Sequence, residues 1–277
     1  MEFHPEKSGT KLMEWYFAYL ALGIFVGFFA GLFGIGGGLV LVPVLTWLFE
    51  MQHLGGAQNL HLALGTSMAA IIYTAIFSAR THHAHGAVNL QVVRNMTPGL
   101  LLGTLLGTLF ASMVSQFYLT IFFALFVYFA ATKMLLDLQP KANRPLPGRA
   151  GMTLVGIGIG AVSSLVSIGG GTLSVPFMMR HNISIKHAIG TSAALGLPIA
   201  LGGTVGYIST GLMLATLPSG TLGFVYLPAV FLLAIGSAFT TPLGAKATHR
   251  LPIKLLRRGF SLLLFILATR MLLKVLV

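Results

Sequence analysis

Ten strongly apolar segments alternate with short polar stretches along the 277-residue chain. Their length and their Leu, Phe, Ala, Gly and Ile content predict membrane helices, because the strands of a membrane barrel would alternate apolar and polar residues at period two. The pattern therefore indicates an all-α, multi-pass membrane protein. The ten predicted segments cover residues 13–33, 39–50, 60–79, 96–114, 118–138, 151–168, 172–180, 187–209, 221–245 and 254–277.

Two of the predicted helices are too short to cross a bilayer unaided. Segment 39–50 has 12 residues, which at ~1.5 Å each measure about 18 Å, whereas the hydrocarbon core is about 30 Å thick. Segment 172–180 is shorter still, and a run of three glycines precedes each segment, Gly36–Gly38 and Gly169–Gly171. We expect each run to supply the missing length as extended backbone, which is tolerated at membrane depth only inside the protein or beside water.

The second half of the chain repeats the first. A proline follows each glycine run after five residues, and since a helix interior loses about 1 kcal/mol per Gly and about 3 kcal/mol per Pro, the pattern predicts a helix break in each half. We expect a first repeat over residues 1–138, a linker over 139–150 and a second repeat over 151–277, the layout of a duplicated transporter. The matched positions are Gly36–Gly38 with Gly169–Gly171, Pro43 with Pro176, Gly65–Ser67 with Gly190–Ser192, and Ala131–Leu135 with Ala268–Leu272.

Composition supports a chain that lies mostly in lipid. Hydrophobic residues make up 56% of the chain, charged residues only 8%, and the mean hydropathy is +0.89, whereas a soluble domain carries about 25% charged residues. The formal charge of +12 fits basic loops of a membrane protein, and no nucleic-acid motif accompanies it.

Cysteine is absent, which excludes disulfides, thiol catalysis and Cys-bound metal. The mixed charges of residues 1–14 do not resemble a cleaved signal, so residues 15–33 should stay as a span.

Basic residues predict the orientation and the inversion of the two repeats. If every segment crosses, one side receives loops 80–95, 139–150, 180–187 and 246–258, which hold most of the Lys and Arg residues, while loops 51–59, 115–117 and 210–220 hold none. The positive-inside rule makes the basic side cytoplasmic and places both termini outside. Equivalent loops of the two halves differ in charge, as an inverted duplication predicts, so we expect two inverted five-helix repeats and no re-entrant second segment.

Inverted halves would bring the starts of both short helices together near the middle of the membrane. The first N–H groups of a helix lack intrahelical partners and carry about half a positive charge, so two converging N-termini predict a small-anion site. Close helix packing is the alternative for the glycines, and bonds to the backbone are the alternative for the hydroxyls. The candidate substrate-binding residues are Gly36, Gly37, Gly38, Leu39, Thr66, Ser67, Gly169, Gly170, Gly171, Thr172, Ser174, Thr191 and Ser192.

The chain offers few groups for ion coupling or metal binding. Asp and Glu are missing from the middle of every span, which argues against a carboxylate proton relay, and Asp137 is expected to pair with Lys133 on its own helix. His61 and His187 are the candidates for proton coupling, and Asn59 and Lys186 beside them for gating; interfacial polar residues are the alternative. His82, His83 and His85 are expected to form a polar loop, so we predict no metal, no cofactor and no catalytic residue.

The repeated motifs resemble those of the TauE/SafE family of membrane permeases. The resemblance rests on Gly34–Pro43 followed by Gly65–Ser67, and on Ile168–Pro176 followed by Ala188–Ser192, and it spans nearly the whole chain. It implies export of sulfite or organosulfonates across the bacterial inner membrane. The halves are unequal, since Leu39–Leu41 in the first replaces Thr172–Ser174 in the second, so the second half should supply more side-chain donors.

The sequence thus predicts a secondary transporter of small sulfur anions that works by alternating access. Transport of another small anion or metabolite is one alternative. A membrane scaffold, or an enzyme for a lipid-like substrate, is the alternative from another class. A closed interior without a cavity near the glycine runs would favour the scaffold, and metal at the three neighbouring histidines would favour the enzyme.

Overall fold

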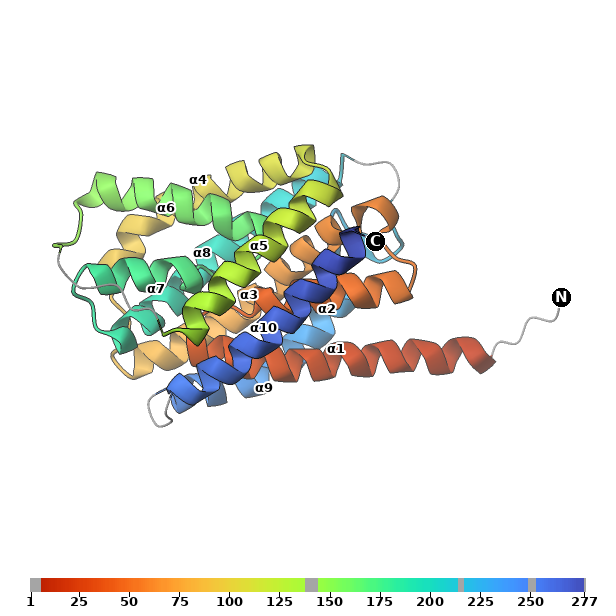
Figure 1. The fold of residues 1–277 in the computed structure, drawn as a ribbon, viewed down its shortest axis with the longest axis horizontal. Helices are drawn as coiled ribbons and strands as arrows, with labels where there is room; N and C mark the ends of the chain where they lie inside the picture. The colour runs from red at the N-terminus through yellow and green to blue at the C-terminus, as the bar shows by residue number, and fades with distance from the viewer. Residues whose placement is uncertain (1–5, 138–143, 214–216, 249–252, 277) are drawn as a thin grey trace.

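The computed structural model describes residues 6–137, 144–213, 217–248 and 253–276, and these residues are almost entirely helical (Figure 1). Six helices are long and apolar enough to cross a membrane, but α2, α6 and α7 have only 14, 17 and 10 residues. Ten membrane-length helices are therefore not formed. The elements are α1 (Glu6–Phe33), α2 (Gly38–Met51), the 3-10 turn η1 (Gly56–Gln58), α3 (Asn59–Ala84), α4 (Leu90–Met113), α5 (Gln116–Leu135), α6 (Arg149–Leu165), α7 (Gly171–Arg180), α8 (Ile185–Gly211), β1 (Thr221–Leu222), β2 (Val225–Tyr226), α9 (Leu227–Ala247) and α10 (Ile253–Leu276).

Helices α3 and α8 pack against each other at the centre of the bundle and are its most buried long helices. On one side α3 contacts α9, which packs along α1, and on the other side α8 contacts α4, which packs along α6. Helices α5 and α10 pack on each other and cross in front of this body (Figure 1). The short helices α2 and α7 thus lie between the central helices and the α5–α10 pair.

Each short helix returns to the end of the bundle from which its half begins. Tyr19, midway along α1, accepts a hydrogen bond of 2.6 Å from Gln52, which directly follows α2. Asn182, just past α7, donates to the carbonyl of Arg144, which precedes α6. Helix α2 starts inside the protein and spans about 21 Å at ~1.5 Å per residue, so a crossing of the whole membrane by the short segments stays a prediction.

The glycine runs form tight turns instead of extended chain. Gly34, Gly36 and Gly37 have φ values of 66°, 79° and 86°, and Gly170 has 81°. These left-handed values suit glycine because it has no Cβ. At the second break Ser167 also has a left-handed φ, of 48°. The prediction that the prolines contribute is wrong, because α2 and α7 continue unbroken through Pro43 and Pro176.

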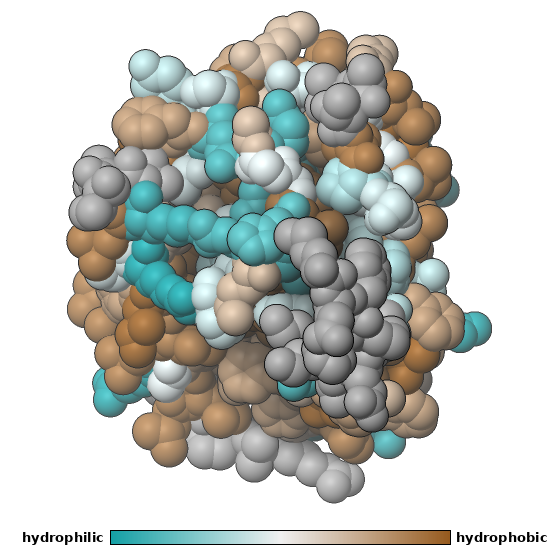
Figure 2. Space-filling view, turned by 90° about the vertical axis from the view of Figure 1, so that its right-hand side faces the viewer, coloured by the Kyte–Doolittle hydropathy of each residue, from teal (hydrophilic) through white to brown (hydrophobic). Residues whose placement is uncertain are grey.

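The basic loops gather at one end of the bundle. There the loop before α4 touches the start of α8 through Asn89 and Thr191, and the end of α5 touches the start of α10 through Asp137 and Arg257. The uncharged loops and both chain ends lie at the opposite end (Figure 1). Figure 2 views that opposite end, where hydrophilic side chains gather near the middle of the face and hydrophobic ones surround them.

The two glycine runs cross in direct backbone contact at the centre of the protein. The Gly169 N–H donates to the Ile35 carbonyl at 2.9 Å. A Cβ added to Gly38 would lie 1.4 Å from the Ser167 carbonyl oxygen, and one added to Gly171 would lie 2.5 Å from that of Gly34. No side chain fits at either position, so close backbone approach, the packing alternative for these glycines, is realised here.

Side chains from distant helices satisfy the carbonyls at the broken end of α1. Carbonyls in the last turn of a helix have no partner within it. His82 lies 3.3 Å from the Gly31 carbonyl, Thr248 donates to Leu32 at 2.7 Å, and Ser192 donates to Gly34 at 2.9 Å. The helix therefore ends inside the protein with its polar backbone paired, as a low-dielectric interior requires.

Two threonines tie the halves together through equivalent hydrogen bonds. Thr66 on α3 accepts from the backbone N–H of Tyr226, the N-cap of α9, at 2.9 Å. Thr191 on α8 accepts from the N–H of Asn89, the N-cap of α4, also at 2.9 Å. Both threonines are fully buried, so each hydroxyl satisfies a loop amide of the other half.

We predict that Gly38→Ala prevents normal assembly, because its methyl group would overlap the Ser167 carbonyl. The matched control is Gly158→Ala on α6, where nothing lies within 4 Å of the added Cβ. The yield of monodisperse protein and the apparent melting temperature in detergent should fall sharply for Gly38→Ala only. Equal melting temperatures for the two variants would contradict the tight crossing.

We predict that Thr66→Val and Thr191→Val each lower the free energy of unfolding by roughly 1–3 kcal/mol, because each leaves a buried N–H without its acceptor. Thr66→Ser and Thr191→Ser keep the acceptor and should stay near wild type. Thermal unfolding in one detergent measures the difference. Valine variants as stable as the serine variants would show that the two hydrogen bonds contribute nothing.

Candidate functional site

The starts of α2 and α7 meet at the crossing of the glycine runs. Gly37 and Gly170 are their N-caps, and the first helical bonds run from Val40 and Leu41 to Gly37, and from Leu173 and Ser174 to Gly170. The amides ahead of these residues lie at the positive ends of the two helices. Gly36–Gly38 and Gly169–Gly171 thus lie side by side, as expected from the sequence.

The space between the two runs is nearly closed. A cavity of about 10 Å³ remains, lined by Gly34, Gly36, Thr74, Ser78 and Gly169 among others. A volume of this size holds about one water molecule, so an oxyanion does not fit between the runs in this conformation.

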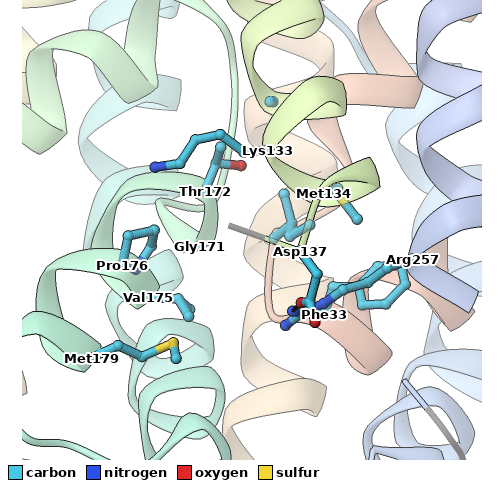
Figure 3. Close-up of a pocket in the computed structure, with 12 residues that line it drawn as sticks. Phe33, Lys133, Met134, Asp137, Gly171, Thr172, Val175, Pro176, Met179 and Arg257 are labelled. Atoms are coloured by element: carbon cyan, nitrogen blue, oxygen red, sulfur yellow. Dashed lines mark hydrogen bonds and ion pairs between the residues drawn. The ribbon is translucent and has the colours of Figure 1, made fainter. Parts of the chain in front are cut away.

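A larger cavity reaches the start of α7 from the basic end of the bundle. We call this space, of about 80 Å³, the α5–α7 cavity (Figure 3). At its inner end are Gly171 and Thr172, and the Oγ1 atom of Thr172 is buried and has no hydrogen-bond partner among the described residues. The cavity is lined by Phe33, Ile35, Ala130, Lys133, Met134, Asp137, Gly171, Thr172, Val175, Pro176, Met179 and Arg257.

The charges in the α5–α7 cavity differ from the expected local pair. Asp137 pairs with Arg257 of α10 at 3.3 Å, and the ammonium group of Lys133 lies 5.1 Å from the centre of the Phe129 ring. Figure 3 draws Lys133 beside Thr172, with Asp137 and Arg257 together near Phe33. The expected Asp137–Lys133 pair is thus replaced by a contact between helices that are far apart in the sequence.

A second cavity opens between α2 and α10 at the opposite end. This α2–α10 cavity of about 250 Å³ is lined by Pro43, Val44, Thr46, Trp47, Glu50, Leu267, Arg270, Met271 and Lys274. Lys274 forms an ion pair with Glu50, and the guanidinium of Arg270 lies 4.5 Å from the centre of the Trp47 ring. A neighbouring cavity of about 530 Å³ shares Thr46, Glu50, Met271 and Lys274 with it. The inner end of the α2–α10 cavity is at Pro43 and does not include Gly38 or Leu39.

The predicted hydroxyl donors fall into two groups. Ser192 donates to the glycine run at Gly34, whereas Thr66 and Thr191 hold loop amides at opposite ends of the bundle. Those two threonines therefore do not converge on one site. In contrast, the buried hydroxyls without a hydrogen-bond partner in the described part of the chain are those of Ser67, Ser78, Ser163, Thr172, Ser174, Thr204 and Thr241. Such groups call for a water or ligand partner, and Ser163, Thr172 and Ser174 lie around the second glycine run.

The four candidate coupling residues lie away from the glycine crossing. His61 is buried with its Nε2 atom 3.0 Å from the Ala111 carbonyl, and Asn59 donates to the Thr46 carbonyl at 2.9 Å. Lys186 and His187 are exposed at the basic end, where the His187 Nδ1 atom lies 2.8 Å from the Ser184 Oγ atom. The structure thus distributes these residues over the two ends of the bundle.

The three neighbouring histidines point in different directions. His82 is fully buried against the end of α1, whereas His83 and His85 are exposed. Within the described residues no group of three His, Asp or Glu side chains could hold a metal ion.

The sequence reasoning missed Lys133, Arg257, Arg270 and Lys274 as residues of the two cavities. A signal existed for two of them, because Ala131–Leu135 and Ala268–Leu272 were recognised as repeated segments that differ only by Lys133 against Arg270. The ion-pair partners carried no such signal, since Arg257 and Asp137 are 120 positions apart.

Comparison with known proteins places the chain in a family. The model of the sulfite exporter TauE/SafE family matches residues 19–271. A "Probable membrane transporter protein" of Haemophilus influenzae is 40% identical over 92% of this chain and 97% of its own length. The "Probable membrane transporter protein YdhB" of Bacillus subtilis is 27% identical over 87% of this chain and 92% of its own, and a similarly named Methanocaldococcus jannaschii protein is 25% identical. No solved structure matches the chain. With six long apolar helices and these relatives, the chain is a multi-pass membrane transporter that belongs to the sulfite exporter TauE/SafE family.

Proposed function

We propose that this protein carries a small sulfur oxyanion, sulfite or an organosulfonate, across the bacterial inner membrane and works as an exporter. The main support is the α5–α7 cavity, which leads from the basic end to the N-terminus of α7 and to the unpartnered Thr172 hydroxyl. Hydroxyl and amide donors at the positive end of a helix suit an oxyanion. The family supplies the choice of sulfur.

The proposal includes two inverted repeats, residues 1–138 and 151–277, joined by the linker 139–150. Support comes from packing contacts that occur in equivalent pairs: α1 on α9 matches α6 on α4, and α3 on α9 matches α8 on α4. The bonds of Thr66 and Thr191 are equivalent in the same sense. The repeat relates α3 to α8 and α5 to α10, so the two helices of each of these pairs correspond to each other. This arrangement fits a pseudo-two-fold axis that passes through both pairs.

Alternating access would use the two cavities in turn. The α5–α7 cavity reaches its glycine run, whereas the α2–α10 cavity ends at Pro43. We assign this conformation to the state that is open toward the basic end. In the opposite state the α2–α10 cavity would extend to Gly38 and Leu39, with the contact between the glycine runs as the central barrier.

The basic end is assigned to the cytoplasm. The helix ends there carry Arg94, Arg149, Arg180 and Lys186, and positively charged segments next to the spans stay on the cytoplasmic side. Both termini then lie outside. An exported anion would therefore enter through the α5–α7 cavity.

Purified protein in liposomes should move sulfite or an organosulfonate down its gradient. Uptake into vesicles is compared with protein-free vesicles and with uptake of acetate, an anion without sulfur. Flux of a sulfur anion above both comparisons is the expected result. Flux of acetate with none of any sulfur anion would support the alternative substrate class and overturn the choice of sulfur.

We predict that Gly37→Leu and Gly170→Leu abolish transport, because both positions have φ values above 80° and the added side chain would collide with Val26 of α1 or with Ile199 of α8. The variants must first insert and purify as wild type does.

Thr172→Val tests the same site without straining the backbone. Loss of its hydroxyl should raise the KM for the anion about fivefold, equivalent to roughly 1 kcal/mol of lost binding. The matched control is Thr97→Val, whose hydroxyl bonds only to Val93 on its own helix. An unchanged KM for Thr172→Val would remove this hydroxyl from the site.

A further inference from the structure

We propose that Lys133 and Arg270 recruit the anion at the two opposite mouths of the transport path, one from each side of the membrane. This inference rests on the proposed anion transport and adds two binding residues to it. The ligand group is an oxyanion, which Lys and Arg side chains recognise by charge and by hydrogen bonds.

The two cavities are built from equivalent positions of the two repeats. Lys133 and Met134 of α5 line the α5–α7 cavity, and Arg270 and Met271 of α10 line the α2–α10 cavity. The facing short helix contributes Pro176 to the first cavity and Pro43 to the second, which are also repeat partners. The repeated segment Ala-Thr-Lys/Arg-Met-Leu therefore places one cation at each end of the bundle.

Each cavity contains one ion pair and one additional cation. In the α5–α7 cavity Arg257 is paired with Asp137, and in the α2–α10 cavity Lys274 is paired with Glu50. For Lys133 and Arg270 the described residues provide no carboxylate partner. Each cavity thus keeps a net charge of about +1, and a positive mouth raises the local concentration of an anion.

An aromatic ring positions each of the two cations. Lys133 lies over Phe129 and Arg270 over Trp47. A cation–π contact orients the side chain without neutralising its charge, so its N–H groups remain available to an oxyanion. Such a contact suits a residue that binds and releases its ligand.

A purely structural role explains the pair less well. Lys133 belongs to the last turn of α5, where a cation stabilises the helix dipole. Arg270 occupies the repeat-equivalent position, but α10 continues to Leu276, and its last turn contains Lys274 instead. The feature that the two positions share is that each lies at the mouth of a cavity.

Side-specific kinetics test the inference. Flux of sulfite is measured in phosphatidylcholine liposomes with a uniform protein orientation, which excludes binding of an anionic lipid headgroup. Lys133→Gln should raise the KM about tenfold for sulfite presented at the basic end and leave the KM from the opposite end within about twofold. Arg270→Gln should show the reverse asymmetry.

Three control variants separate charge from structure. Lys133→Arg and Arg270→Lys exchange the residues of the two repeats and keep the positive charge, so each should have a lower KM than the matching glutamine variant. Arg258→Gln removes an exposed cation next to Arg257 that lines neither cavity, and it should change neither KM. Because the chain has no cysteine, a chemical rescue can be added. The Lys133→Cys variant should regain its affinity for sulfite when 2-aminoethyl methanethiosulfonate attaches a positively charged group to the new thiol.

The outcomes for the inference and for the proposed function are distinguishable. If wild-type protein moves sulfite and the glutamine variants keep both KM values, or raise both equally, the inference is overturned and the transport proposal stands. If wild-type protein moves no anion, binding is read from tryptophan fluorescence during titration with sulfite, in a Trp15→Phe background that leaves Trp47 as the reporter. A signal lost in Arg270→Gln would then support the inference, and the absence of any signal in wild type would overturn it together with the proposed function.

Discussion

The fold depends on the contact between two backbone turns at the centre of a membrane protein. Broken helices leave amides and carbonyls for which lipid offers no hydrogen-bond partner. Here many of these groups are bonded by the other break or by side chains of nearby helices. The Gly169 amide bonds to Ile35, while Thr248, Ser192 and His82 reach the last carbonyls of α1. Because the crossing leaves no space for a Cβ at Gly38 or Gly171, it fixes where α2 and α7 start. The cavities beside those helices follow from this placement.

The glycine crossing and the outer helices α5 and α10 occupy different regions of the protein. Helices α3, α8, α1, α9, α4 and α6 form a packed body of paired helices, whereas α5 and α10 lie across its front and line the two cavities (Figure 1). The Asp137–Arg257 ion pair joins the end of α5 to α10, and the Glu50–Lys274 ion pair joins α2 to α10 at the opposite end. A small displacement of α5 and α10 relative to the short helices would therefore change the width of one cavity mouth without breaking the body.

Much of the helical pattern could be predicted from the sequence, because apolar length and glycine position are local signals. Every predicted segment has a corresponding helix, and both breaks fall at the glycine runs. The prolines were misjudged because α2 and α7 tolerate Pro43 and Pro176 inside a helix. Local reasoning also chose Lys133 as the partner of Asp137, whereas the partner comes from α10. The bonds of Thr66 and Thr191 join positions more than 100 residues apart, and no spacing rule within one helix could have indicated them.

The reciprocal bonds of Thr66 and Thr191 have the form of an isologous interface, in which two copies of one surface contact each other. Each half completes the helix start of the other half, just as the subunits of a symmetric dimer do. The halves have nevertheless diverged at the crossing, where Ser167 with a φ of 48° stands in the position of Gly34, and Thr172 in that of Leu39. In a dimer of identical subunits, any substitution would appear on both sides of the membrane at once. Under the proposed inverted arrangement, joining the two copies in one chain lets each face of the transport path change by itself, so that capture and release of one substrate can be adjusted separately.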